Sequence, residues 1–196
     1  FEKTLNKLKA RGHRIIDIKL PSVSYALPCY YIVMPAEVSA NLSRFDGMRY
    51  GLHIDGADLL GDYAKTRGEG FGPEVRRRIL IGTYVLSAGY YDSYYGKANA
   101  LRQLITNDFL EAFKEVDCIA TPTTPTPAFR FGEKSDPLAM YAADVFTVPA
   151  NLTGMPALSV PTEGVLREGV QLPLGIQLTA PHRCENLLFQ IGKELE

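Results

Sequence analysis

The chain has 196 residues, with 21 Lys and Arg against 22 Asp and Glu, a formal net charge of −1 and 46% hydrophobic residues. A chain of this length and composition can bury an ordinary hydrophobic core, which excludes disorder, collagen and coiled coil. The balanced charge leaves no electrostatic footprint for a nucleic-acid backbone, so we expect no direct nucleic-acid binding. The longest uncharged stretches, 20–36 and 145–162, each contain three prolines. We therefore expect no transmembrane helix and no membrane partner.

Three cysteines are far apart in the sequence and form no CxxC pair: Cys29, Cys118 and Cys184. Their odd number and spacing argue against a disulfide framework and a metal site, so the simplest inference is a reducing cytoplasm. The sequence begins at Phe1, and helical spacing of apolar residues is present from that position. We expect a fragment of a longer protein without a signal peptide.

The amino-terminal 51 residues predict two helices, a strand and a loop. Residues 2–11 form an amphipathic pattern that ends at Gly12, and the β-branched run 15–20 predicts a strand. Residues 24–42 have helical apolar spacing interrupted by two prolines, which predicts a kinked or broken helix. Residues 43–51 have the turn chemistry of a loop.

The middle of the chain predicts two long helices. Gly72 and Pro73 are a typical helix start, and that helix is predicted to reach about residue 88. A second apolar stripe predicts a helix over 93–116.

The carboxyl-terminal part predicts strands and short helices. A strand at 118–120 ends in the segment TPTTPTPAF, and ligand crevices of open α/β sheets lie at such strand ends. Residues 138–147 predict a short helix, 157–160 and 172–179 a hairpin whose turn contains Gly164 and Gly169, and residues from Glu185 a final helix. We find no repeat or dividing linker, so residues 1–196 are expected to form a single compact α/β unit.

The sequence contains no complete catalytic machinery. Its three histidines have no Cys or carboxylate at ligand spacing, and neither common glycine-rich phosphate loop is present. No serine is flanked as in the GxSxG turn of many hydrolases.

Arg78 is the most informative single residue. In a regular helix it shares a face with four apolar or small residues, namely Val75, Ile79, Gly82 and Leu86. A partly buried guanidinium needs an anion, and its planar fork matches a carboxylate. The alternatives are a structural ion pair and a side chain that reaches solvent along its apolar stem.

Asp144 is the matching acidic candidate, at the edge of the apolar stripe of its helix. A carboxylate there could hold an ammonium group, and the alternative is an exposed helix residue. One anion-seeking Arg and one cation-seeking Asp could together grip an amino acid zwitterion. Tyr30 and Tyr31 add a phenol donor or an apolar wall, unless they are simply core aromatics.

Several segments together resemble one known family. They are SANLSRFDGMRYG, EGFGPEVRRRILIGTYVLSAGYYDSYYGKA, CIATPTTPTPAF, DPLAMYAADVFTVPANLTGMPALSVP and LPLGIQLTAP. In order and spacing they resemble the carboxyl-terminal part of the amidase signature family, and within it the A subunits of glutamyl-tRNA(Gln)/aspartyl-tRNA(Asn) amidotransferases. The resemblance implies a mixed β-sheet covered by helices and amide hydrolysis by a Ser, cis-Ser, Lys triad. Nothing here matches the triad, so this chain alone is expected to be inactive.

The resemblance also implies the site and the partners. Glutamine would be held by Arg78, Asp144 and Tyr30, with Tyr31 as the alternative tyrosine. The chain itself would need no cofactor or metal, because ATP and Mg²⁺ would be used by a partner subunit. Partners would be the B and C subunits of a cytoplasmic heterotrimer, and through them a mischarged Glu-tRNA(Gln). A stand-alone amidase of the same family and a non-catalytic subunit-docking domain remain the alternatives.

Overall fold

The computed structural model describes residues 1–195, which gather into two compact units. One contains Phe1–Leu27 and the chain from Leu101 onward, and the other is Pro28–Ala100. The expectation of a single compact unit is therefore corrected. Both boundaries fall inside helices, α2 (Ala26–Leu42) and α5 (Lys97–Ala112), so no loop or change of composition marks them in the sequence.

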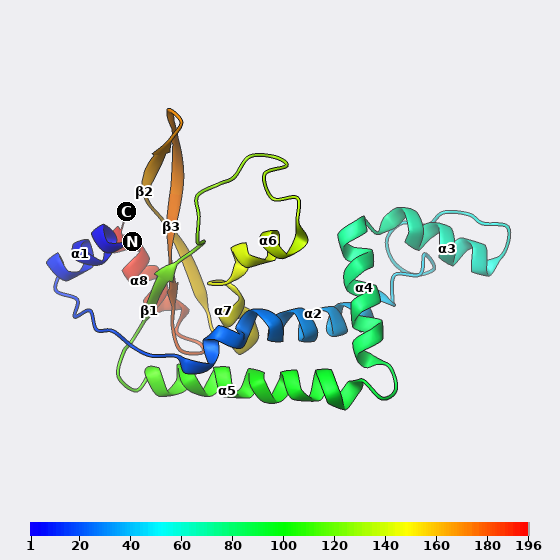
Figure 1. Cartoon of the computed structure of the whole chain (residues 1–196), viewed down its shortest axis with the longest axis horizontal. Helices are drawn as coiled ribbons and strands as arrows, with labels where there is room; N and C mark the ends of the chain where they lie inside the picture. The colour runs from blue at the N-terminus through cyan, green and yellow to red at the C-terminus, as the bar shows by residue number, and fades with distance from the viewer. Residues whose placement is uncertain (196) are drawn as a thin grey trace. The chain divides into compact units, whose positions relative to one another are not determined.

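The first unit combines helices with one β-sheet (Figure 1). Besides the second part of α5 it contains α1 (Glu2–Ala10), η1 (Pro21–Tyr25), β1 (Ile119–Pro122), α6 (Pro137–Tyr141), η3 (Ala142–Asp144), α7 (Val148–Thr153), β2 (Ala157–Arg167), β3 (Val170–Thr179) and α8 (Glu185–Leu195). The expected combination of helices and β-sheet is confirmed.

The sheet has the strand order β1-β3-β2, and both pairs are antiparallel. The predicted hairpin is confirmed, and its strands are longer than expected. Its turn consists of Glu168 and Gly169, whose φ angles of 53° and 81° are those of the tight turns that match strand twist. Gly164 lies instead within β2, where the register shifts between Thr162 and Val165.

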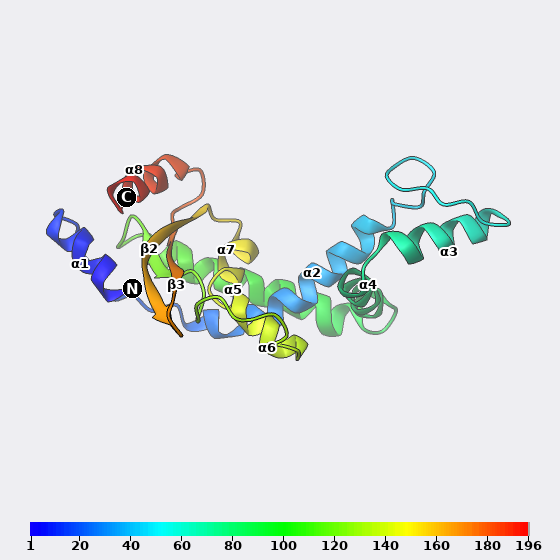
Figure 2. The same ribbon diagram turned by 90° about the horizontal axis from the view of Figure 1, so that it is seen from above.

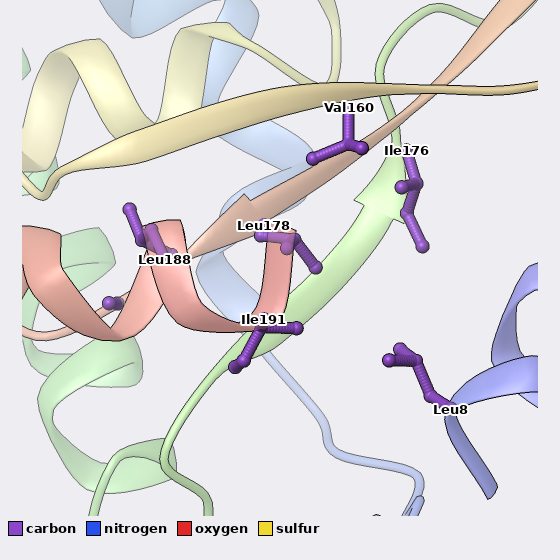
Figure 3. Close-up of a cluster of buried hydrophobic side chains, with 7 residues drawn as sticks. Leu8, Val160, Ile176, Leu178, Leu188 and Ile191 are labelled. Atoms are coloured by element: carbon purple, nitrogen blue, oxygen red, sulfur yellow. The ribbon is translucent and has the colours of Figure 1, made fainter. Parts of the chain in front are cut away.

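The core of this unit lies where α8 packs on the sheet (Figure 2). Leu188 and Ile191 of α8 meet Val160 and Leu178 of the hairpin strands, as Figure 3 shows. Leu8 of α1 completes the cluster and is 4% exposed. Burial of these aliphatic side chains stabilises the unit by roughly 1.5–3 kcal/mol each.

Three sequence predictions need correction. Residues 15–20 form no strand, because no neighbouring strand within residues 1–195 supplies the hydrogen bonds that a strand requires. The helix 24–42 is not broken: α2 runs from Ala26 to Leu42 with Pro35 inside it. Pro28 lies in the first turn, where its missing N–H has no partner to lose. The helix expected over 138–147 is the short α6 followed by the 3₁₀ turn η3.

The second unit is helical. It contains the second part of α2, then α3 (Leu59–Gly70), α4 (Pro73–Leu86) and the π-helical turn η2 (Asp92–Gly96) that leads into α5. The helix predicted from Pro73 is confirmed as α4, whereas α3 was missed. Figure 1 shows α4 running across the carboxyl-terminal part of α2. In residues 1–195 no helix combines the length and the hydropathy needed to cross a membrane.

Candidate functional site

Arg78 lies on the face of helix α4 that is turned toward helix α2. Gly82, one turn further along α4, is buried against the carbonyl of Pro35 in α2. Because residues four apart share a helix face, Arg78 also points toward α2. Its Nη1 lies 3.4 Å from the sulfur of Met34, and its guanidinium carbon lies 5.5 Å from the ring centre of Tyr31.

The guanidinium of Arg78 is held on a second side by Glu74, one turn earlier in α4. Nε donates to Oε1 of Glu74 at 2.7 Å. Burial disfavours the charged form of Arg78, but the hydrogen bond and the charge of Glu74 outweigh it, so the pKa of Arg78 is raised above its ordinary value. The side chain is 23% exposed and remains a cation at every physiological pH.

The contact with Glu74 is the structural ion pair that the sequence left open as an alternative. Glu74 is shared, because it is also paired with Arg77. One carboxylate and two guanidinium groups together carry a net charge of +1. The excess of positive charge within this group of three side chains favours an anionic ligand.

Tyr31 is the tyrosine whose ring lies against the guanidinium. At 5.5 Å from the ring centre, Arg78 is within the range of a cation–π interaction. Tyr30 packs edge-to-face on Tyr31, with ring centres 5.2 Å apart and an interplanar angle of 85°. The structure thus brings Tyr30, Tyr31 and Arg78 together in one unit.

Asp144 belongs to the other unit, where it is the last residue of η3. Its backbone carbonyl accepts hydrogen bonds from the backbone N–H and the hydroxyl of Thr147, at 3.0 and 3.1 Å. These bonds fix the turn between η3 and α7. The residue is exposed, in agreement with the alternative considered for it, and its part in a site stays a prediction.

Sequence reasoning missed two residues of this cluster. Glu74 could have been found, since an acid four residues before Arg78 on one helix is a standard ion-pair spacing. Met34 gave no signal, because its contact depends on how α4 crosses α2.

The histidines have local structural partners. His13 Nε2 lies 2.8 Å from Glu194, His182 Nε2 lies 2.9 Å from the carbonyl of Thr153, and both ring nitrogens of His53 contact oxygens of its own loop. No three His, Cys, Asp or Glu side chains in residues 1–195 are grouped as metal ligands.

A cavity of about 490 Å³ lies in the first unit, beside the strand β1. Two runs of consecutive residues, 13–18 and 115–121, line it together with apolar side chains of α1 and α8. Cys118 lies in this lining, and burial raises the pKa of its thiol to about 11. The thiol is thus a protonated, unreactive group at neutral pH.

Comparison with known proteins gives one consistent result. A family model described as Amidase matches residues 1–189. The chain is 55% identical over 197 residues to the A subunit of glutamyl-tRNA(Gln) amidotransferase from Maricaulis maris, covering all of this chain and 40% of that protein. It is 57% identical over 197 residues to the protein of the same name from Parvibaculum lavamentivorans, covering all of this chain and 39% of that protein.

A solved structure agrees with these relatives. The crystal structure of the A subunit of glutamyl-tRNA(Gln) amidotransferase from Thermotoga maritima is similar with a TM-score of 0.72 and 37% identity, over 100% of this chain and 37% of that one. The chain thus spans about two fifths of the length of the curated relatives that it matches.

Proposed function

This chain belongs to the amidase family, and from that premise we propose that it is the glutamine-binding part of the glutaminase subunit of a tRNA-dependent amidotransferase. The names of its relatives, which are A subunits of glutamyl-tRNA(Gln) amidotransferase, support the assembly and the substrate class. The observation that carries the glutamine assignment is the partial burial of Arg78 together with its ion pairing. Its side chain is 23% exposed, and Glu74, its carboxylate partner, is also paired with a second arginine.

In this proposal Arg78 binds the α-carboxylate of glutamine. A guanidinium forms two parallel hydrogen bonds with a carboxylate, and charged hydrogen bonds of this kind contribute about 1.5–3 kcal/mol each. The Tyr31 ring limits the directions in which the guanidinium can turn. Tyr30 beside it supplies a phenol that can donate to the same ligand.

Asp144 binds the α-ammonium group. An exposed carboxylate on a short, hydrogen-bonded turn is suited to a cation that arrives with the substrate. Arg78 and Asp144 together select a ligand with both charges of a free amino acid. Simple amides lack these charges and would gain nothing from the pair.

The reaction itself uses groups outside these 196 residues. A serine of the remaining part of the family's domain attacks the side-chain amide of glutamine, the C–N bond breaks, and ammonia leaves. Water then hydrolyses the acyl-enzyme and releases glutamate. This chain contributes binding and orientation, which place the amide carbon within reach of the nucleophile.

The ammonia would be used by the partner subunits B and C. A partner subunit would use ATP and Mg²⁺ to activate the glutamate of a mischarged Glu-tRNA(Gln), which the ammonia would then amidate. No cofactor is assigned to the residues described above.

The test uses the full-length protein and its glutaminase activity. Asp144→Asn should raise the apparent KM for glutamine by roughly 10- to 150-fold, the equivalent of one charged hydrogen bond, and Arg78→Ala, which removes two, should raise it by at least as much. Arg78→Lys, which keeps the charge but loses the fork, should recover only part of the loss. An unchanged KM in both variants, or equal activity on glutamine and on simple amides, would refute the proposal in favour of a general amidase.

A further inference from the structure

We propose that Glu74 is a positioning residue that holds the guanidinium of Arg78 by one edge and turns its other end toward the carboxylate of the substrate. This inference rests on the proposed function of Arg78. It concerns a residue that would touch no substrate atom and would act only through Arg78.

The contact between the two side chains defines the orientation. A guanidinium can receive a carboxylate along the edge that contains Nε, or end-on at Nη1 and Nη2. Nε carries a single hydrogen, and it is donated to Glu74 at 2.7 Å. A ligand carboxylate is therefore directed to the Nη1 and Nη2 end.

The neighbour of Nη1 agrees with this direction. Nη1 lies 3.4 Å from the thioether sulfur of Met34. Sulfur of this kind is a weak acceptor, so an incoming carboxylate oxygen is the stronger partner for the same nitrogen. The Tyr31 ring lies 5.5 Å from the guanidinium carbon and restricts rotation about the remaining bonds.

Glu74 is itself well anchored for this task. It lies in the first turn of α4, where the helix dipole favours a carboxylate. Its two oxygens are divided between two arginines, with Oε1 toward Arg78 and Oε2 toward Arg77. A carboxylate fixed at two points imposes one orientation on each guanidinium.

Two effects of Glu74 on glutamine binding have opposite signs, and this makes the inference testable. As a positioning group, Glu74 lowers the KM because Arg78 is already oriented before the substrate binds. As a competing anion, Glu74 raises the KM because it neutralises part of the charge of Arg78. The direction of change on removing Glu74 shows which effect is larger.

The experiment measures glutamine hydrolysis by full-length protein carrying Glu74→Ala or Glu74→Gln. Glu74→Ala should raise the KM for glutamine about tenfold, with kcat within about twofold of the parent enzyme. Glu74→Gln keeps an oxygen that can accept from Nε but removes the charge, so its KM should stay near the parent value. This recovery by the conservative variant is not expected if Glu74 only stabilises the helix.

Two controls separate positioning from folding. Arg77→Ala removes one of the two contacts that fix Glu74 but leaves the hydrogen bond with Arg78, so it should raise the KM by less than Glu74→Ala does. A glutamine analogue without the α-carboxylate should bind equally to the parent and to Glu74→Ala, because it has nothing for Arg78 to hold. Thermal unfolding of each variant shows whether the change is a loss of fold.

The outcomes distinguish this inference from the function on which it rests. If the KM for glutamine falls in both Glu74 variants, Glu74 is a competing anion and the inference is overturned. A rise in KM that is equally large for glutamine and for the analogue also overturns it. If Arg78→Ala raises the KM and Glu74→Ala does not, the glutamine site stands and the positioning role is wrong. If neither Glu74→Ala nor Arg78→Ala changes the KM for glutamine, the proposed function of Arg78 is wrong, and the positioning role of Glu74 is wrong with it.

Discussion

Gly82 of α4 faces the carbonyl of Pro35 in α2 so closely that a β-carbon on Gly82 would lie 1.9 Å from that oxygen. Beside this contact, the hydroxyl groups of Ser39 and Thr83 are 2.9 Å apart and hydrogen-bonded. The two helices therefore cross with their backbones almost in contact. Met34 and Tyr31 reach Arg78 because of this approach.

Gly82→Ala should separate the two helices. A methyl group at this position must displace backbone, so the free energy of unfolding should fall by about 1–3 kcal/mol or more. Gly68→Ala is the matched control, because Gly68 is exposed within α3 and a β-carbon added to it would have nothing within 4 Å. It should raise the stability by roughly 0.4–1 kcal/mol. Chemical denaturation of both variants checks the difference, and equal effects would contradict the tight crossing.

His53 should titrate above its usual pKa of 6.5. Its Nε2 lies 3.0 Å from Oδ1 of Asp55 and its Nδ1 lies 2.9 Å from the carbonyl of Gly47, so the doubly protonated ring has two acceptors. The hydrogen bond with Asp55 is the main cause of the raised pKa. A raised pKa means that the contact stabilises the loop below pH 6.5 and that this stabilisation is lost as the pH rises through the folded pKa.

An NMR titration of His53 checks this, with Asp55→Asn as the comparison. The substitution should lower the pKa of His53 toward the ordinary value. If the two titration curves coincide, the pair is not formed in solution.

Cys118 should resist alkylation at neutral pH. Burial raises the pKa of its thiol to about 11, so at pH 8 only about one molecule in a thousand carries the reactive thiolate. Iodoacetamide labelling followed by peptide mass spectrometry should show almost no modification of Cys118 at pH 8 and a steep increase as the pH approaches 11. Rapid labelling at pH 7 would show that the cavity beside β1 is open to solvent and that the thiol is not desolvated.

Helices with clear start signals were predicted correctly from the sequence, whereas a helix rich in glycine was not. Gly72 and Pro73 correctly predicted the start of α4, because they act through local backbone geometry. Helix α3 contains Gly61, Gly68 and Gly70, which argue against a helix. It is nevertheless started by Asp58, whose side chain accepts from the backbone N–H of Gly61 at 2.7 Å.

Features that depend on distant partners were less predictable. The β-branched run 15–20 is a strand pattern without a neighbouring strand in the described part of this chain, so it does not join the sheet. The pair of Glu74 and Arg78 follows from a spacing of four residues, whereas the contact of Arg78 with Tyr31 follows only from the crossing of two helices. The division into two units crosses α2 and α5 and leaves no mark in composition.

Strand β1 lies at one edge of the sheet. On one side β1 is hydrogen-bonded to β3, and on the other, among residues 1–195, no strand pairs with it. A sheet edge of this kind can pair with an extended segment, since the ladder is built from main-chain groups and not from particular side chains. The protein concentration then decides whether the pairing segment belongs to the same molecule or to a neighbouring copy. Synthesis at high concentration is therefore expected to favour association through β1 over the monomer.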